Sequence, residues 1–225
     1  MQKLYTACAH LPPDFECIRS LLQTGTYTPE MLAKVLLEHM DKNCTYEVSD
    51  FSYENNRSPE NYEIHCGYLY EMTKLFLEFG FDPNLVIDHD GFANQLQFAD
   101  LEYVAADTMK LLIEHGLDPN AQFDSESVFD FVEDHIILDV SLGLLEDDED
   151  WRYYNIEFHL WLVLIGYGAK LSNGNLPIKM KDSFTTDIFR QHEKYDYRIE
   201  YTKEDPDGWI MYIFDRETNE VVATV

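Results

Sequence analysis

Histidines and carboxylates that could bind a metal are abundant in this chain, but they are scattered. The eight histidines are His10, His39, His65, His89, His115, His135, His159 and His192. No two of them have the His-x-x-x-His or His-Glu-x-x-His spacing that places ligands on one helix face. His115 directly precedes a glycine, where a histidine is expected to cap or pack a helix end. We therefore expect no metal site.

Nucleophile motifs are missing as well. The sequence has no Gly-x-Ser-x-Gly, no glycine-rich phosphate loop and no Cys-x-x-Cys pair. Buried free thiols are expected for the four cysteines, which are Cys8, Cys17, Cys44 and Cys66. The chain is predicted to be a non-enzymatic protein without a cofactor. An enzyme is the alternative, and it would need a pocket with titratable groups of shifted pKa.

Negative charge is concentrated in the middle third. The formal net charge is −27, and residues 75–151 contain one basic residue, Lys110, against 20 acidic ones. Such a field repels phosphate backbones and anionic membranes and attracts a basic protein. We expect a basic protein partner and no direct nucleic-acid binding. The alternative is that the charge serves solubility alone.

One acidic run could recognise a partner directly. Residues 146–150 are five consecutive carboxylates, followed by Trp151, Tyr153 and Tyr154. A calcium loop alternates its ligands and turns at a fixed glycine, and neither feature occurs here. The run is either a solvated loop or a landing patch for Lys and Arg side chains, with the aromatic residues as anchors.

No segment resembles a membrane span or a secretory signal. The longest apolar run, Leu160 to Ile165, is far shorter than the roughly 20 residues that cross a bilayer. Residues 1–16 contain charges and prolines but no apolar signal core. We expect a cytoplasmic protein without membrane contact.

A repeat is visible in residues 72–84 and 108–120, which align on Gly80 and Gly116, 36 residues apart. Each copy has apolar residues at helical spacing, then a glycine that can end a helix in the left-handed conformation, then Asp-Pro-Asn. The proline prevents the helix from resuming. Weaker copies align on Gly168 and on Gly25.

Residues 111–124, Leu-Leu-Ile-Glu-His-Gly-Leu-Asp-Pro-Asn-Ala-Gln-Phe-Asp, resemble the second helix and outgoing hairpin of an ankyrin repeat. The resemblance implies a mainly α chain, with an ankyrin-like α-solenoid of about three to four divergent repeats over residues 1–176. The first half of each repeat departs from the family: residues 93–96 and 126–129 lack its Thr-Pro-Leu-His. The distance from Gly116 to Gly168 also requires an insertion. An irregular helical domain is the alternative.

Residues 177–225 are predicted to be a linker and a small antiparallel β-meander. Two-residue alternation over 195–201 indicates a half-buried strand, and 209–214 is apolar on both faces, as in a central strand. A third strand is expected at 220–225. We expect the meander to cap the helical repeats, because three strands are stable only when one face packs on something.

The ankyrin resemblance implies a protein-binding scaffold with a concave surface. The predicted partner-binding residues are acidic or aromatic: Asp88, His89, Asp90, Asp124, Glu126, Asp147, Asp148, Glu149, Asp150, Trp151, Tyr153 and Tyr154. We expect a monomer that neutralises a basic protein, with an immunity partner of a toxin as one such role. The alternative is an acidic mimic of nucleic acid that inhibits a DNA- or RNA-handling enzyme.

Overall fold

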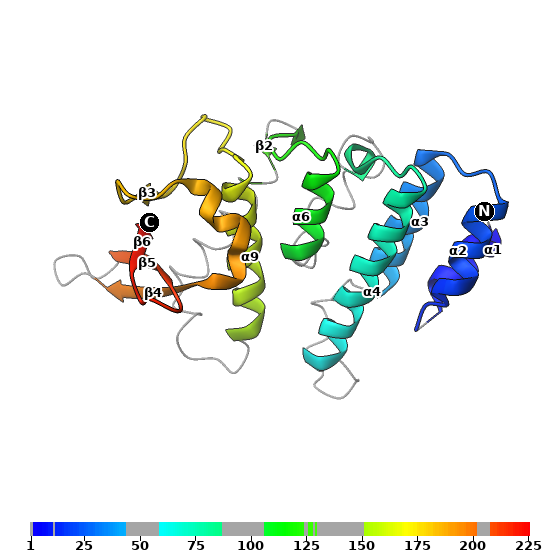
Figure 1. The fold of residues 1–225 in the computed structure, drawn as a ribbon, viewed down its shortest axis with the longest axis horizontal. Helices are drawn as coiled ribbons and strands as arrows, with labels where there is room; N and C mark the ends of the chain where they lie inside the picture. Colours follow the sequence, from blue (N-terminus) through cyan, green and yellow to red (C-terminus); the bar gives the residue numbers. More distant parts are fainter. Residues whose placement is uncertain are drawn as a thin grey trace. The chain divides into compact units, whose positions relative to one another are not determined.

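The computed structural model describes residues 2–10, 12–43, 59–86, 106–123, 126–127, 129, 151–201 and 208–225. The chain forms two compact units, residues 1–118 and 119–225. The described structure is mostly helical, with a small antiparallel sheet near the C-terminus, as predicted (Figure 1). The boundary between the two units, after residue 118, lies earlier in the chain than the boundary predicted after residue 176. The assignment of 177–225 as a cap stays a prediction.

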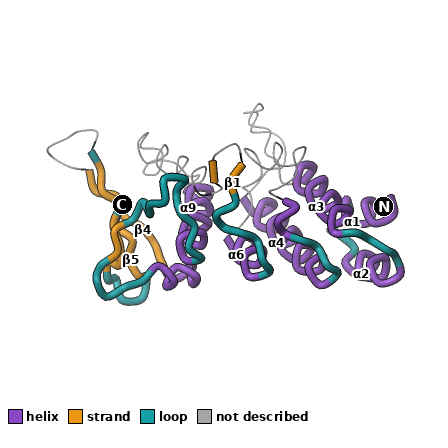
Figure 2. The backbone as a smooth tube through the Cα atoms, turned by 90° about the horizontal axis from the view of Figure 1, so that it is seen from above, coloured by secondary structure: helices purple, strands orange, loops and turns teal. Residues whose placement is uncertain are grey.

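The first unit is built from helices. Their bounds are α1 Gln2–Ala9, α2 Phe15–Thr24, α3 Pro29–Asn43, α4 Pro59–Glu78, the 3-10 helix η1 Pro83–Val86, and α6 Ala106–Glu114. Helix α1 packs against α2 and α3, α3 against α4, and α4 against α6. Helices α3 and α4 run side by side, and Figure 2 shows the same neighbours from above. Each helix therefore buries its apolar residues against the next helix.

Apolar side chains at helical spacing form the core of this unit. Leu32 and Leu36 are four residues apart on α3, and Met72 and Phe76 are four apart on α4, so each pair lies on one face. All four have 2% or less of their surface exposed. Burying such residues supplies most of the folding free energy, roughly 1.5–3 kcal/mol for each side chain.

Capping residues and prolines mark where several of these helices begin. Asp14 accepts a hydrogen bond from the backbone N–H of Cys17 at 2.9 Å, which satisfies a group that α2 itself cannot. Helices α3 and α4 begin at Pro29 and Pro59. Proline suits a first helical position because the N–H it lacks would have no partner there.

The second unit combines one long helix with strands. Its elements are β1 Gln122–Phe123, β2 Glu126–Ser127, α9 Trp151–Gly166, β3 Lys179–Met180, the 3-10 segment η2 Thr186–Lys194, β4 Tyr195–Tyr201, β5 Trp209–Asp215 and β6 Val221–Thr224. Residues 160–165 of α9 are all buried, so this part of the helix is covered on every side. Segment η2 packs against α9.

The C-terminal strands form the predicted meander and gain one further strand. The sheet order is β3-β6-β5-β4, with every pair antiparallel. Strand β5 is central, as its apolar sequence predicted, because β4 and β6 pair with its two edges. Neither β3 nor η2 was predicted from the sequence. Strand β3 has two residues, too few for an alternation pattern, and pairs with β6.

Three helices end in the same way at a left-handed glycine, as predicted for Gly80, Gly116 and Gly168. Their φ angles are +89°, +106° and +84°. After each glycine, the next backbone N–H bonds back to the carbonyl five residues earlier: Phe81 to Phe76, Leu117 to Leu112, and Ala169 to Leu164. This is the Schellman arrangement, in which the residue after the glycine becomes buried.

The weak copy at Gly25 is different. Gly25 is extended, with φ −95° and ψ 170°, and its N–H bonds to the Leu21 carbonyl. Helix α2 does end at this glycine, but without the left-handed conformation of the other three. Residues 26–28 lead directly into α3 without an Asp-Pro-Asn turn. Gly168 also lacks that turn and is left-handed, so the absence of the turn does not by itself set the conformation at Gly25.

Among the residues described, no helix is both long enough and apolar enough to cross a bilayer.

Candidate interaction surface

The turn after α4 is organised by the side chains of Asp82 and Asn84. The Asp82 carboxylate accepts hydrogen bonds from the backbone N–H and the side-chain amide of Asn84, at 3.0 and 3.2 Å. This local bond is the Asx turn expected from Asp-Pro-Asn. The Asn84 amide is thereby held in one orientation before it contacts anything distant in sequence.

Asn84 then bridges to the corresponding turn after α6. Its Nδ2 donates to the carbonyl of Gly116 at 3.0 Å, and its Oδ1 accepts the backbone N–H of Asp118 at 3.1 Å. Both backbone groups belong to a turn where the helix ladder has ended and would otherwise lack protein partners. The two turns of the first unit are thus joined by one side chain.

Asn120 makes the same two contacts within the second unit. Its Nδ2 donates to the carbonyl of Gly168 at 3.3 Å, and its Oδ1 accepts the backbone N–H of Lys170 at 3.0 Å. In each bridge, the amide contacts the glycine that ends a helix and the residue two positions later. The repeat found in the sequence therefore recurs as a repeated hydrogen-bond pattern.

A short hairpin follows Asn120. Gln122 pairs with Ser127 and Phe123 with Glu126, so β1 and β2 are joined by a two-residue turn. Glu126, one of the predicted partner-binding residues, lies on β2. This is where the resemblance placed an outgoing hairpin tip. Asp124, in the turn itself, lies outside the described residues.

The predicted aromatic anchors begin helix α9. Trp151 is its first residue, and Tyr153 and Tyr154 belong to its first turn. The remaining predicted residues lie outside the described part of the chain: Asp88, His89, Asp90, Asp147, Asp148, Glu149 and Asp150. The predicted surface as a whole is untested.

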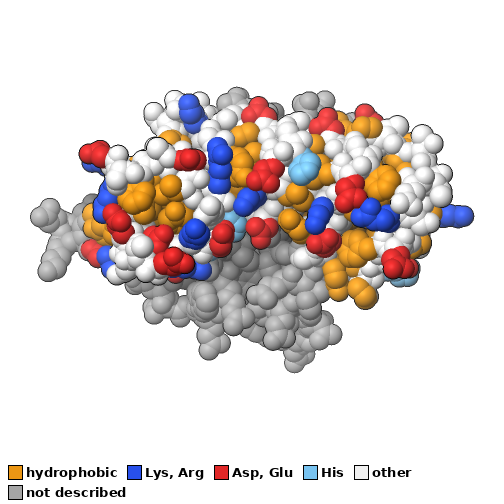
Figure 3. All heavy atoms as spheres, in the orientation of Figure 1, with side chains coloured by type: hydrophobic (Ala, Val, Ile, Leu, Met, Phe, Trp, Pro, Cys, Tyr) orange, Lys and Arg blue, Asp and Glu red, His pale blue; other side chains and the backbone are white. Residues whose placement is uncertain are grey.

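Charges of both signs are mixed over the described surface. Figure 3 shows red and blue side chains interspersed on the face drawn. The charge count agrees, because residues 1–74 and 152–225 carry only a small excess of acid. Most of the chain's negative charge belongs to residues 75–151, which supply the two asparagine-bridged turns and the segments after them.

Histidines and cysteines in the described residues have structural surroundings. His115 caps α6, since its Nδ1 donates to the Leu111 carbonyl at 2.8 Å. Where residues are described, no three His, Cys, Asp or Glu side chains gather as a metal site would require. Cys8 is free and buried, as predicted, whereas Cys17 is free but exposed. Cys17 stands near the start of α2, on the side of the helix that faces solvent.

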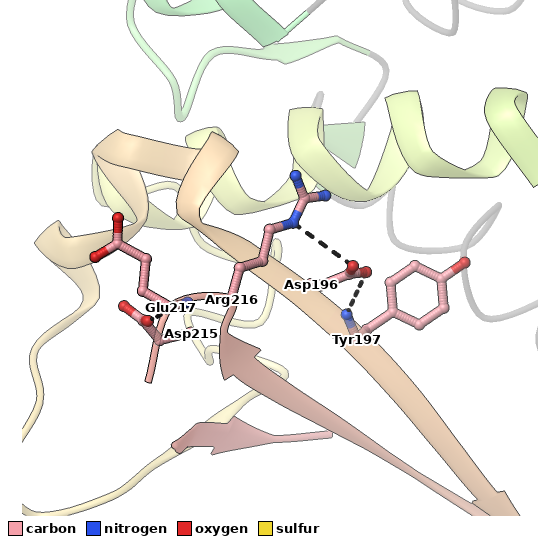
Figure 4. Close-up of polar contacts among 5 residues, drawn as sticks. All are labelled: Asp196, Tyr197, Asp215, Arg216 and Glu217. Carbon is pink, nitrogen blue, oxygen red and sulfur yellow. Dashed lines mark hydrogen bonds and ion pairs between the residues drawn. The ribbon is translucent and has the colours of Figure 1, made fainter. Parts of the chain in front are cut away.

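Polar contacts link β4 to the turn that follows β5 (Figure 4). The Asp196 carboxylate accepts the backbone N–H of Tyr197 at 2.9 Å and lies 3.5 Å from Nε of Arg216. Asp215 accepts the N–H groups of Glu217 and Thr218, and these bonds lower the pKa of its carboxyl. These contacts stabilise a turn and a strand edge, so their role is structural.

Two features of the structure could not be found from motifs. The Asn84 and Asn120 bridges join residues more than 30 positions apart, although the repeated Asp-Pro-Asn, which contains both asparagines, was a usable signal for them. No sequence motif predicted the contact between His159 and His192, because 33 residues separate them and they belong to no recognised pattern.

Comparisons of the chain with protein-family models, with curated proteins and with solved structures found no match.

Proposed function

We propose that this protein is a non-enzymatic scaffold that binds a basic partner protein through acidic residues of its middle third. The observation that carries this proposal is the coincidence of two features. Residues 75–151 hold most of the excess negative charge, with one basic residue against 20 acidic ones. The same segment contains Asn84 and Asn120, whose hydrogen bonds bridge neighbouring turns. These bridges fix the backbone positions from which the acidic segments begin.

The fold we propose for the scaffold is a short ankyrin-like solenoid. Three observations support it: the same left-handed helix end occurs three times, the same asparagine bridge occurs twice, and a two-residue hairpin follows the second bridge. In a solenoid, each unit contacts its neighbours, and the turns line up along one surface. Segments that leave such turns can contact a partner together, as the ankyrin resemblance implies.

Electrostatics supports a basic partner in particular. A local excess of negative charge raises the association rate with a basic protein and repels phosphate. The carboxylates would supply steering, and aromatic residues such as Trp151 and Tyr154 would supply buried contact area. Neutralisation of a basic toxin by an immunity protein would use this chemistry. We propose it as one form that the partnership could take.

The test compares capture of proteins by wild-type bait with capture by two charge-neutralised variants. The first variant removes four predicted contacts, Asp88→Asn, Asp90→Asn, Asp124→Asn and Glu126→Gln. The control removes the same charge elsewhere, at the exposed residues Glu16→Gln, Glu71→Gln, Asp182→Asn and Glu217→Gln. We expect the wild-type and control baits to capture one basic protein. The first variant should capture at least ten-fold less of that protein at low salt.

Equal capture by both variants would contradict the proposed surface. If no protein is captured in a salt-sensitive way, the negative charge serves solubility alone. The mimic of nucleic acid is a separate outcome. A mimic would capture an enzyme that acts on DNA or RNA, and the nucleic acid would compete with this protein for that enzyme.

A further inference from the structure

Two histidine rings meet where segment η2 packs against helix α9. His159 belongs to α9 and His192 to η2, and their ring centroids are 5.2 Å apart in an edge-on arrangement. His192 has only 7% of its surface exposed, and His159 is half-buried. Two imidazoles this close cannot both be protonated without strong mutual repulsion, because little water lies between them to screen the charges.

The environment favours the neutral form of His159. Its Nδ1 has no hydrogen-bond partner among the described residues, and burial outweighs the hydrogen bond to the His192 backbone, which by itself favours the charged form. The adjacent Phe158 packs at 4.7 Å against Tyr197 of β4, which adds an apolar wall. A proton on Nδ1 would therefore be buried without an acceptor.

Charged groups on the neighbouring elements act in both directions. Arg216, which follows β5, opposes a positive charge on His159, and Asp196 of β4 favours one. Those two side chains are themselves paired at 3.5 Å, so their effects largely offset each other (Figure 4). On η2, the Glu193 carboxylate lies 3.9 Å from Nε2 of His192 and is mostly exposed to solvent. Burial consequently dominates over the nearby charges.

We propose that His159 and His192 form an acid-sensitive latch, which is closed at neutral pH and opens the contact between α9 and η2 as the solution becomes acidic. Opening would release the other contacts between these elements. One of them is the Arg190 side chain, which donates to the carbonyl of Gly166 at 2.9 Å and lies over the Tyr167 ring. The latch is independent of the partner-binding proposal.

The direction of the pH effect on stability follows from the lowered pKa of His159. Burial, the His192 ring and Arg216 lower the pKa of His159 from 6.5 to about 4. Because the folded protein binds this proton less readily than the unfolded chain, the stabilisation is complete above pH 6.5. It is lost progressively as the pH falls from 6.5 to about 4. Between pH 7.5 and pH 5, the unfolding equilibrium constant should rise about 30-fold through this group.

The experiment measures urea unfolding of the full chain at pH 7.5 and pH 5 for the wild type, His159→Gln and the control His10→Gln, whose histidine is exposed. On acidification, the unfolding equilibrium constants of the wild type and of His10→Gln should rise by the same factor. The unfolding equilibrium constant of His159→Gln should rise about 30-fold less. Equal acid sensitivity in all three proteins would overturn the latch. A purely structural role would lower the stability of His159→Gln by the same factor at both pH values.

A second measurement does not depend on a variant at the buried ring. NMR titration of the His159 ring in the folded wild type should give a midpoint well below 6.5, and a midpoint near 6.5 would also overturn the latch. In Arg216→Gln, whose arginine is 42% exposed, the midpoint should move up, because a cation that opposes protonation has been removed. Hydrogen exchange at pH 5 should show α9 and η2 opening together.

Discussion

Asn84 holds the backbone of Asp118 across 34 residues of sequence: its Oδ1 accepts the Asp118 N–H at 3.1 Å while its Nδ2 donates to the Gly116 carbonyl at 3.0 Å. The side chain is oriented by Asp82 before it makes either bond. One amide group thus satisfies a donor and an acceptor that the end of α6 leaves open. Asn120 makes the equivalent pair of bonds to Gly168 and Lys170.

Replacing Asn84 with alanine should destabilise the first unit by about 1–2 kcal/mol, since each of two partly exposed hydrogen bonds contributes about 1 kcal/mol. The measurement is urea unfolding monitored by circular dichroism. Asn175→Ala is the control, because Asn175 lies on an exposed turn and uses its backbone carbonyl to accept a bond from Leu171. Equal stability of the two variants would show that the bridge contributes nothing.

Gly116→Ala should destabilise the protein by about 1–2 kcal/mol, the usual cost of placing a side chain on a left-handed backbone. The matched control is Gly67→Ala. A Cβ at either glycine would meet no atom within 4 Å, but only Gly116 has a positive φ, +106°.

Gly67 lies inside α4, where alanine is the better helix former. Gly67→Ala should therefore stabilise the protein by about 0.5–1 kcal/mol. The two thermal melts would then shift in opposite directions. A shift of the same sign in both variants would contradict backbone conformation as the cause.

Cys17 should react with an alkylating reagent much faster than Cys8. Burial raises the pKa of the Cys8 thiol to about 12, so almost no thiolate forms there at pH 8. Cys17 is exposed on α2. Iodoacetamide labelling at pH 8, followed by peptide mass spectrometry, should show Cys17 modified at least ten times faster in the native protein. In urea the two rates should converge, and a native Cys8 rate equal to that of Cys17 would refute its burial.

Removal of residues 195–225 should make the remaining chain aggregate. The deletion takes away the Tyr197 ring that lies 4.7 Å from Phe158 and the Tyr195 ring that lies 5.1 Å from Phe189. Both phenylalanines, which are buried in the intact chain, would be exposed. Size-exclusion chromatography and thermal melting of the truncated chain provide the measurement. A soluble monomer with a cooperative melt would reject the capping role predicted for these residues.

Local features of this protein were decided by its sequence. Helix ends at Gly80, Gly116 and Gly168 follow from a glycine after an amphipathic run, and this choice depends on φ and on nearby backbone groups alone. The first predicted strand follows from two-residue alternation, and the second follows from a short run that is apolar on both faces. The fourth glycine, Gly25, shows the limit, because its backbone is extended although it too follows an amphipathic helix.

Contacts between distant residues were decided only by the tertiary structure. The partners of Asn84, the meeting of His159 with His192 and the pairing of β3 with β6 all join segments separated by 30 residues or more. No periodicity encodes such contacts, because they depend on how whole elements pack. The sequence alone determined where helices stop and where charge accumulates. Packing determined which polar groups become buried together, and burial is what gives His159 its sensitivity to pH.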